Sequence, residues 1–382
     1  MLKTIIIIGT RPEAIKMALL AKELNKRKGI KNYLCVSGQH RSMLDQVLDF
    51  FAIKPDFDLN IMQENQQLND ITGKIIIEVS KIYDQINPDL ILVHGDTNTC
   101  FAAALAAYYK KIPVAHVEAG MRTGNINVPF PEEANRVLTG RISNFHFAPT
   151  SLNVKNLIAE GVKRDCIIKT GNTVIDSLIY TSKKIKIFSD QVTDQKLIKA
   201  VSDIKKIILV TGHRRENFGG GFKNICLALK NIAIQNPDCY IIYPVHLNPN
   251  VQQPVLKALT GINNIILTSP LSYPDFVFLL NRAYLILTDS GGIQEEGPSL
   301  GKPVLVMRDI TERPEAIQAG TVKLVGTDRK KIEKEVNHLL NDKKQYHKMS
   351  KMVNPYGDGK ATEKIADWII NNQSRIKKAK PE

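Results

Sequence analysis

The chain has 382 residues, of which 43% are hydrophobic, and a formal net charge of +14. This length is sufficient for two domains, and the composition is that of an ordinary globular protein. No run of about 18 apolar residues is present, so we expect no membrane-spanning helix. The basic residues are dispersed, without zinc-finger spacing or an aromatic RNA-binding motif, which disfavours a nucleic-acid partner.

Cysteine usage and the N-terminal residues predict a cytoplasmic protein. The cysteines are widely scattered and form neither a metal-ligand spacing nor a disulfide framework; they lie at positions 35, 100, 166, 226 and 239. This pattern is typical of a reducing compartment. The isoleucine-rich start is too short for the core of a signal peptide, and it lacks a basic flank and a cleavage site.

The first half of the chain alternates predicted strands with helical patterns. Strands are expected at residues 4–9, 33–36, 89–94, 113–117, 144–147 and 167–170. In the first of them, residues 5–8 form a continuous β-branched run. Such a run is expected in a strand of a parallel sheet that is covered on both faces.

The stretch GTRPEAIKM, residues 9–17, follows this first run directly. Thr10 is a suitable helix N-cap, and Glu13 completes a capping-box pattern with it. A helix N-terminus attracts anions, and Arg11 and Lys16 add positive charge there. The stretch therefore predicts a site for a phosphate or a carboxylate; the alternative is a capped helix with solvated cations.

The second half repeats the alternation, with strands expected at residues 206–211, 240–244, 264–268, 284–288, 303–306 and 322–325. The repeated alternation predicts an α/β protein of two Rossmann-like, doubly wound domains. A lysine-rich polar stretch at 181–206 places the hinge near 171–175, with domains at 1–172 and 173–355. Because ligands bind outside the carboxyl ends of such strands, we expect the active site in the interdomain cleft.

Polar residues and glycines follow five of the predicted strands. They are Gly9-Thr10-Arg11, Gly95-Asp96-Thr97, Glu118-Ala119-Gly120, Gly212-His213-Arg214 and Asp289-Ser290-Gly291-Gly292. Any one of these groups could be an ordinary turn. Five together, drawn from both halves, predict one shared ligand-binding cleft.

The turn Ser290-Gly291-Gly292 within LTDSGGIQEE predicts contact with a nucleotide. Its glycines let a ligand approach the backbone, and the N-terminus of the following helix favours a diphosphate. Glu296 lies about one turn further on, where its carboxylate could accept hydrogen bonds from a ribose diol. The alternative is a plain strand-to-helix turn with surface glutamates.

Three acids from separate segments are candidates for proton transfer. Asp96 lies in HGDTNT, Glu118 in HVEAGMRTGN and Glu132 in PFPEEANR. Acids converging from separate segments are what proton transfer at a sugar carbon requires. The alternatives are a helix cap for Asp96 and, for Glu132 and the neighbouring Glu133, a helix first turn in which acids are favoured.

The second half contributes His213, flanked by Arg214 and Arg215. With Arg11 and Lys16, these groups could neutralise the charge of a leaving diphosphate. The sequence has no Walker motif and no GxGxxG after the first strand, and no Asp-x-Asp or His/Cys cluster in it suggests a metal. ATP, NAD and metal chemistry are therefore disfavoured, and we expect neither a cofactor nor a metal.

Taken together, the motifs resemble those of the bacterial non-hydrolysing UDP-N-acetylglucosamine 2-epimerases. In chain order they are GTRPEAIKM, HGDTNT, HVEAGMRTGN, PFPEEANR, GNTVID, GHRREN, YPVHLNP, DSGGIQEE and GKPVLVMRDITERPEA. The resemblance extends from residue 4 to about 370. It implies a GT-B arrangement of two Rossmann-like domains, with a C-terminal helix at about 356–372 crossing back to the first domain. It also implies a homodimer that needs no metal or nicotinamide.

The resemblance further implies the interconversion of UDP-N-acetylglucosamine and UDP-N-acetylmannosamine, through elimination of UDP to 2-acetamidoglucal and its re-addition. This reaction would supply precursors of surface polysaccharides. The implied catalytic residues are Asp96, Glu118, Glu132 and His213. The implied substrate-binding residues are Arg11, Lys16, Arg136, His213, Ser290, Gly291, Gly292, Glu296 and Arg313. Arg136 is expected to orient one of the acids.

Some members of this family bind a second UDP-N-acetylglucosamine as an activator. The residues that match segments of that site are Gln39, His40, Arg41 and His246. Ser42 and Asn65, however, stand where activated members carry glutamine and arginine. These departures leave a strict dependence on the activator open.

Four other functions remain as alternatives. A hydrolysing epimerase would share the elimination step but release free N-acetylmannosamine. An epimerase could instead act on a related UDP-2-acetamido sugar. A retaining GT-B glycosyltransferase would need an acceptor channel but not three acids. A nucleic-acid-binding role for the basic surface would require salt-sensitive binding to DNA.

Overall fold

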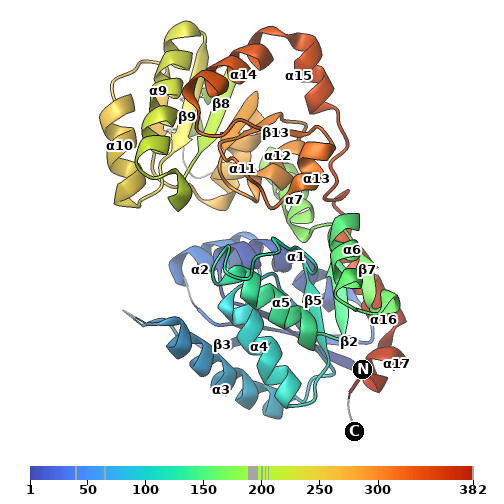
Figure 1. The fold of residues 1–382 in the computed structure, drawn as a ribbon. Coiled ribbons are helices and arrows are strands. Elements are labelled where there is room, and N and C mark those ends of the chain that lie inside the picture. The colour runs from blue at the N-terminus through green and yellow to red at the C-terminus, as the bar shows by residue number, and fades with distance from the viewer. Residues whose placement is uncertain are drawn as a thin grey trace. The chain divides into compact units, whose positions relative to one another are not determined.

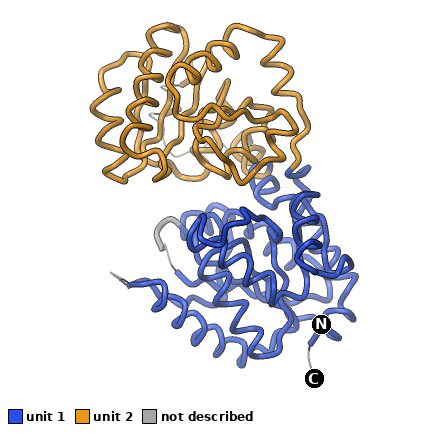
Figure 2. The backbone as a smooth tube through the Cα atoms, viewed as in Figure 1, with its two compact units in different colours: residues 1–179, 356–382 blue, residues 180–355 orange. Residues whose placement is uncertain are grey.

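The computed structural model describes residues 1–38, 41–63, 66–187, 197–198, 201–202, 204 and 206–380. The chain divides into two compact units (Figure 2). The first unit comprises residues 1–179 and 356–382, and the second comprises residues 180–355. The helix α7 (Thr173–Ile187) contains the boundary between them.

The first unit contains a parallel sheet (Figure 1). In the described residues its strands are β1 (Leu2–Ile8), β2 (Ile30–Val36), β3 (Phe57–Asp58), β4 (Leu90–His94), β5 (Val114–Val117), β6 (Phe145–Ala148) and β7 (Ile167–Lys169). They pair in the order β3-β2-β1-β4-β5-β6-β7, and every pair is parallel. The strand order reverses between β1 and β4, which is where ligands bind in such sheets.

Helices lie on the faces of this sheet (Figure 1). Those of the first unit are α1 (Arg11–Lys26), α2 (Arg41–Phe50), α3 (Leu68–Ile86), α4 (Asn98–Tyr109), α5 (Glu132–Ile142), α6 (Ser151–Ala159), the 3-10 helix η1 (Arg164–Cys166), α16 (Ala361–Asn371) and α17 (Gln373–Lys378). Ile5, Ile6 and Ile7 of β1 are fully buried. Because neighbouring side chains of a strand point to opposite faces, both faces of the sheet are covered at β1.

The second unit has the same organisation. Its described strands are β8 (Lys206–Thr211), β9 (Cys239–Pro244), β10 (Ile265–Thr268), β11 (Leu285–Thr288), β12 (Val304–Val306) and β13 (Val322–Leu324). They form a parallel sheet in the order β10-β9-β8-β11-β12-β13. The helices whose bounds are described are η3 (Arg215–Asn217), α9 (Gly220–Gln235), α10 (Pro249–Leu259), α11 (Tyr273–Arg282), α12 (Ile293–Ser299), α13 (Pro314–Gln318), α14 (Arg329–Asn341) and α15 (Lys343–Ser350).

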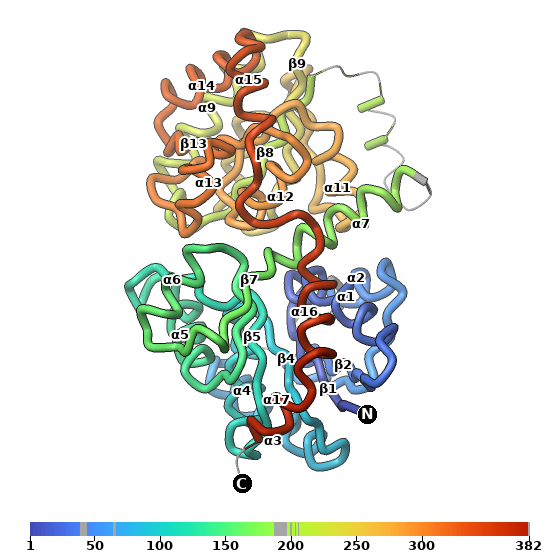
Figure 3. The backbone as a smooth tube through the Cα atoms, turned by 90° about the vertical axis from the view of Figure 1, so that its right-hand side faces the viewer, coloured from blue at the N-terminus to red at the C-terminus, as the bar shows by residue number. Residues whose placement is uncertain are grey.

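The C-terminal helix α16 packs against α1 in the first unit (Figure 3). Its Trp368 lies against two rings of β6, with centroids 4.8 Å from Phe145 and 5.5 Å from Phe147. Asp176, near the start of α7, caps this helix. One carboxylate oxygen accepts a hydrogen bond of 2.8 Å from the Thr362 amide, and the other accepts one of 3.1 Å from Ala361. The last part of the chain is therefore built into the first unit.

The α/β class with two parallel, helix-covered sheets is confirmed, and each predicted strand overlaps an observed one. The sequence analysis missed β3, because its two residues are too few to show a pattern. None of the described helices is long and apolar enough to cross a membrane. The predicted location of the site in an interdomain cleft concerns the placement of the two units and stays a prediction.

Candidate active site

The turn after β1 is fixed by the predicted capping box, which the structure confirms. The Thr10 amide donates a hydrogen bond of 2.8 Å to Glu13 Oε2, and the Thr10 hydroxyl accepts one from the Glu13 amide. Thr97, in the turn after β4, donates a hydrogen bond of 2.7 Å to Glu13 Oε1. Burial raises the pKa of Glu13, although these hydrogen bonds oppose the rise. Glu13 thus joins two strand ends and has a structural role.

Gly9 is required in this turn for close packing. A Cβ atom there would overlap the Thr99 hydroxyl and lie 2.5 Å from Ser37 Oγ. Arg11, the first residue of α1, is half-buried, and Lys16 lies further along the same helix. The glycine therefore lets the turn after β1 pack tightly against the first turn of α4 and the residue that follows β2.

Glu118, which follows β5, is surrounded by three nitrogen atoms. Its Oε2 lies 2.5 Å from Lys16 Nζ, 2.8 Å from Asn172 Nδ2 and 3.4 Å from His94 Nε2. The backbone at Glu118 has φ of 64°, a left-handed conformation that is uncommon outside glycine. Such strain persists only where the surrounding structure enforces it, and it is concentrated at functional sites.

The protonation state of Glu118 follows from these neighbours. Burial of the carboxyl group disfavours its charged form, but Lys16 and His94, by charge and hydrogen bonding, overcome this effect. Together they hold the pKa of Glu118 well below its usual range. The group is therefore an ionised carboxylate at neutral pH and can accept a proton.

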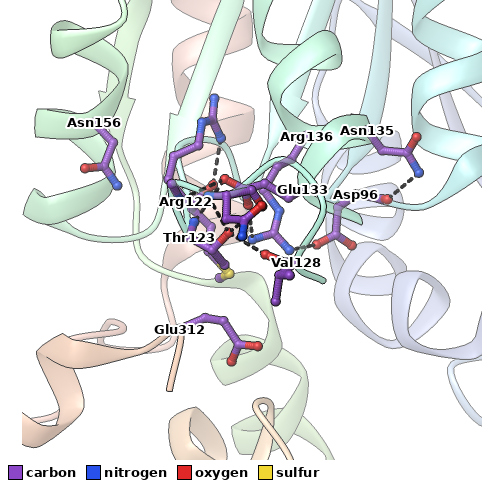
Figure 4. A network of polar contacts seen from close by, with 12 residues as sticks. Asp96, Arg122, Thr123, Val128, Glu133, Asn135, Arg136, Asn156 and Glu312 are labelled. Carbon is purple, nitrogen blue, oxygen red and sulfur yellow. Dashed lines mark hydrogen bonds and ion pairs between the residues drawn. The ribbon is translucent and has the colours of Figure 1, made fainter. Parts of the chain in front are cut away.

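Asp96, which follows β4, belongs to a second network (Figure 4). Arg136 of α5 donates from Nη2 to Asp96 Oδ2 at 2.5 Å, and its Nη1 lies 3.1 Å from Glu133 Oε2. Asn135 donates a hydrogen bond of 2.9 Å to the Asp96 carbonyl. The Arg136 side chain is 7% exposed and that of Asp96 is 29% exposed. The aspartate is thus held from one side while part of it stays accessible.

Glu133 anchors the loop that leads into α5. Its Oε1 accepts hydrogen bonds from the amides of Thr123, at 3.0 Å, and Gly124, at 3.3 Å. The neighbouring Glu132 is half-buried, and within the described residues its buried Oε2 has no hydrogen-bond partner. Of these two adjacent acids, Glu133 accepts backbone hydrogen bonds that fix the loop, whereas Glu132 makes no such bond through Oε2 within the described residues.

In the second unit, Asp289 holds the GHRREN segment at the end of β8. This fully buried carboxylate accepts hydrogen bonds from the amides of His213, at 2.9 Å, and Arg214, at 2.9 Å. Asn217 donates a third, of 3.1 Å, from its side chain. Asp289 therefore fixes the backbone of the loop that carries His213.

The His213 side chain stays 42% exposed. Its ring stacks on that of His246, which follows β9, at a centroid distance of 5.4 Å. Desolvation lowers the pKa of His213, with further lowering by Arg214 and His246, and Asp289 opposes the change. A neutral imidazole at this position can donate a hydrogen bond without adding a full charge.

Arg313 lies directly over the glycine turn that follows β11. Its Nε donates a hydrogen bond of 2.6 Å to Glu295, whose side chain is fully buried. A Cβ atom at Gly291 would lie 2.7 Å from Arg313 Cζ. At Gly292 the nearest atom to such a Cβ is Glu296 Oε1, at 3.6 Å. Gly291 thus admits the guanidinium, and the predicted residues Gly291, Gly292, Glu296 and Arg313 lie together with Ser290 at the start of α12.

Arg308 pairs with two glutamates, one of which, Glu312, also lies near Arg313. Arg308 donates to Glu312 Oε2 at 2.8 Å and to Glu216 Oε1 at 2.6 Å. Burial opposes the ionisation of Glu312, but Arg308 dominates and lowers the pKa of Glu312 to about 2. The Glu312 carboxylate also lies 3.6 Å from Arg313 Nη1. The segment after β12 is therefore fixed by charge pairs.

Several site residues were missed by sequence reasoning. Asn172 belongs to the GNTVID motif, Asp289 precedes the glycine turn, and Glu295 lies in DSGGIQEE, but none of them received a role. Their positions in recognised motifs were the available signal. Their partners are distant in sequence, and they could be identified only from the fold.

The proposed activator residues are only partly described. Gln39, His40 and Asn65 lie outside the described residues, as do the side chains of Arg41 and Ser42 at the start of α2. His246 is described and is exposed beside His213. Across the described ranges, no group of three or more His, Cys, Asp or Glu side chains could hold a metal ion.

Comparison with known proteins places the chain in a family. The family model described as UDP-N-acetylglucosamine 2-epimerase matches residues 22–370. A UDP-N-acetylglucosamine 2-epimerase of Campylobacter jejuni is 56% identical over 97% of this chain and 99% of its own length.

Solved structures give the same result. The Neisseria meningitidis UDP-GlcNAc 2-epimerase bound to UDP-GlcNAc is similar with a TM-score of 0.92 and 49% identity, covering 97% of this chain and all of that one. A kitacinnamycin glycotransferase, with 12% identity and a TM-score of 0.63, covers 99% of both chains and shares the fold alone. From the family match and the near full-length identity, the chain belongs to the UDP-N-acetylglucosamine 2-epimerase family.

Proposed function

We propose that this chain interconverts UDP-N-acetylglucosamine and UDP-N-acetylmannosamine by eliminating UDP and adding it back. The observation that carries the proposal is the placement of Glu118, whose carboxylate contacts Lys16, Asn172 and His94 and whose backbone has a left-handed conformation. A carboxylate must be ionised to accept a proton from carbon, and Glu118 meets that condition. Its low pKa makes it a weak base, so the transfer relies on the acidity that the C2 proton gains as UDP departs.

The proposed reaction is an elimination of UDP followed by its re-addition. The C1–O bond to UDP breaks and UDP leaves with the electron pair, so that positive charge develops at C1. The C2–H bond then breaks, its electrons form the C1–C2 double bond of 2-acetamidoglucal, and a carboxylate takes the proton. For the return, a proton is added to the opposite face of C2 and UDP attacks C1. No redox partner is required.

The residues fit these steps. Glu118 is the base in one direction, and Asp96 and Glu132 are candidates for the acid on the other face of C2. Arg136 orients Asp96, to which it donates a hydrogen bond. The turn Ser290-Gly291-Gly292 with Arg313 would hold the diphosphate, because backbone amides and a guanidinium both favour a dianion.

Other parts of the proposal rest on the family resemblance. Arg11, Lys16 and His213 would stabilise the leaving diphosphate, and Glu296 would bind the ribose. A homodimer, a supply of surface polysaccharide precursors and independence from metal and nicotinamide follow from the same source. A cytoplasmic location suits the scattered cysteines.

Proton NMR of UDP-N-acetylglucosamine incubated with the enzyme in D2O tests the reaction. We expect UDP-N-acetylmannosamine carrying deuterium at C2. Free N-acetylmannosamine and UDP would identify a hydrolysing enzyme instead, and unchanged substrate would contradict the proposal. The Glu118→Gln variant is the control for background exchange.

A further inference from the structure

Asn172, the second residue of GNTVID, contacts Glu118 although it lies beyond β7, just before α7. Its Nδ2 donates a hydrogen bond of 2.8 Å to Glu118 Oε2. Its Oδ1 accepts one of 3.1 Å from the Val174 amide. Because both ends of the side-chain amide have partners, the amide has one orientation, with its nitrogen toward the carboxylate. The residue is 2% exposed.

The backbone of Asn172 is held by the C-terminal part of the first unit. Its amide donates a hydrogen bond of 2.7 Å to the Tyr356 carbonyl. Gly171, with φ of 92°, packs on Gly357, where an added Cβ would lie 3.2 Å from the Gly357 Cα. Asn172 is therefore fixed by a segment that lies far along the chain, and its position cannot shift without moving that segment.

We propose that Asn172 is a positioning residue for Glu118, and that the segment at Tyr356 and Gly357 holds it in place for this purpose. The inference deepens the proposed function and rests on Glu118 acting as the base. A neutral amide is suited to this task because it donates a hydrogen bond to the carboxylate without adding a group that titrates.

Other groups also face Glu118. Lys16 approaches it from α1 and His94 from β4, and Cys100 of α4 is close enough to be influenced by its charge. Lys16 and His94 remain when Asn172 is replaced. Loss of the Asn172 amide should therefore raise the pKa of Glu118 and disturb the orientation of its carboxylate. Glu118 should still ionise, because Lys16 and His94 remain.

The test compares the pH dependence of kcat/KM for Asn172→Asp and Asn172→Ala with that of the wild-type enzyme. Asn172→Asp keeps the shape, the acceptor for Val174 and the backbone bond to Tyr356, and thermal unfolding of both variants checks that they are folded. It places a second carboxylate beside Glu118 and removes the donor. At low pH, kcat/KM falls as Glu118 becomes protonated, and this decrease is the acid limb of the profile. The acid limb should move to higher pH by about one unit for Asn172→Ala, and by more for Asn172→Asp.

Asn156 supplies the matched control. It donates a hydrogen bond of 2.9 Å to the Gly120 carbonyl, two residues after Glu118. Asn156→Asp and Asn156→Ala change the same turn without removing a donor from the acid. Their acid limbs should coincide with the wild-type limb, and UDP affinity should change less than about twofold in all four variants.

The outcomes separate two kinds of failure. If both Asn172 variants keep the wild-type pH dependence, or lose the same factor of kcat at every pH, the positioning role is overturned. An equal shift in the Asn156 variants would overturn it as well. If Glu118→Gln keeps full turnover, the assignment of Glu118 as the base fails, which is a failure of the proposed function itself.

Discussion

Lys16 Nζ and Glu118 Oε2 are 2.5 Å apart, although the two residues are separated by 102 positions in the sequence. Their side chains are only 13% and 8% exposed. At such low exposure the attraction between the charges is screened far less than at the surface. The pair links α1 to the end of β5, and it makes Lys16 part of the environment of a candidate catalytic acid as well as a candidate ligand for UDP.

We expect Lys16→Met to move the acid limb of kcat/KM to higher pH by about one to three units. The ammonium lowers the pKa of Glu118, so its removal raises that pKa, and the base is then protonated at a higher pH. Lys16→Arg keeps the charge and should shift the limb less. A pH profile that coincides with the wild-type profile, with weaker UDP binding alone, would show that Lys16 serves only the diphosphate.

Neutralising each candidate acid should separate catalysis from binding. We expect Asp96→Asn, Glu118→Gln and Glu132→Gln each to lower kcat by about 100-fold or more, because a carboxamide cannot transfer the proton. Calorimetric titration should find UDP still bound. Glu78→Gln, a change at an acid paired with Lys81 on the surface, is the control. Near-normal turnover in all three variants would refute the acid/base assignment.

The two glycines of the turn after β11 allow a matched comparison. Gly291→Ala places a methyl group against Arg313, whereas the corresponding methyl at Gly292 meets its nearest atom at an ordinary contact distance of 3.6 Å. We therefore expect Gly291→Ala to weaken UDP binding by about tenfold or more, equivalent to about 1.4 kcal/mol. Gly292→Ala should weaken it less. Equal losses would mean that displacement of Arg313 is not the cause.

The Arg308–Glu312 pair makes stability depend on pH. The pKa of Glu312 is about 2 in the folded protein and is ordinary in the unfolded chain. Its stabilising contribution is therefore complete above about pH 4.5 and is lost as pH falls toward 2. Thermal unfolding should show Glu312→Gln destabilised by about 2 kcal/mol at pH 7, with a smaller difference near pH 3. A difference that does not depend on pH would contradict this account.

The strands could be predicted because each is a short run of buried apolar residues in a parallel sheet. Ile5, Ile6 and Ile7 show this pattern without interruption, and all three are fully buried. β3 could not be predicted, since Phe57 and Asp58 become a strand only through pairing with β2. Its existence depends on the tertiary structure rather than on a local pattern.

In the candidate site too, some features follow from a local sequence pattern and others depend on the tertiary structure. Thr10 and Glu13 are three residues apart, so their capping box could be read from the sequence. The partners of Glu118 could not, because Lys16 and Asn172 reach it only through the order of the strands and the return of the chain at β7. Sequence motifs therefore name the candidate reactive groups, whereas the fold identifies the side chains that contact them.

The capping of α16 by Asp176 has a consequence for biosynthesis. The first unit is assembled from both ends of the chain, residues 1–179 and 356–382, whereas the second is one continuous segment. During translation the carboxylate of Asp176 leaves the ribosome long before the amides of Ala361 and Thr362 that it binds. The second unit can thus complete its contacts before residues 361 and 362 are synthesised, whereas the first unit lacks the helix that Asp176 caps until those residues have emerged.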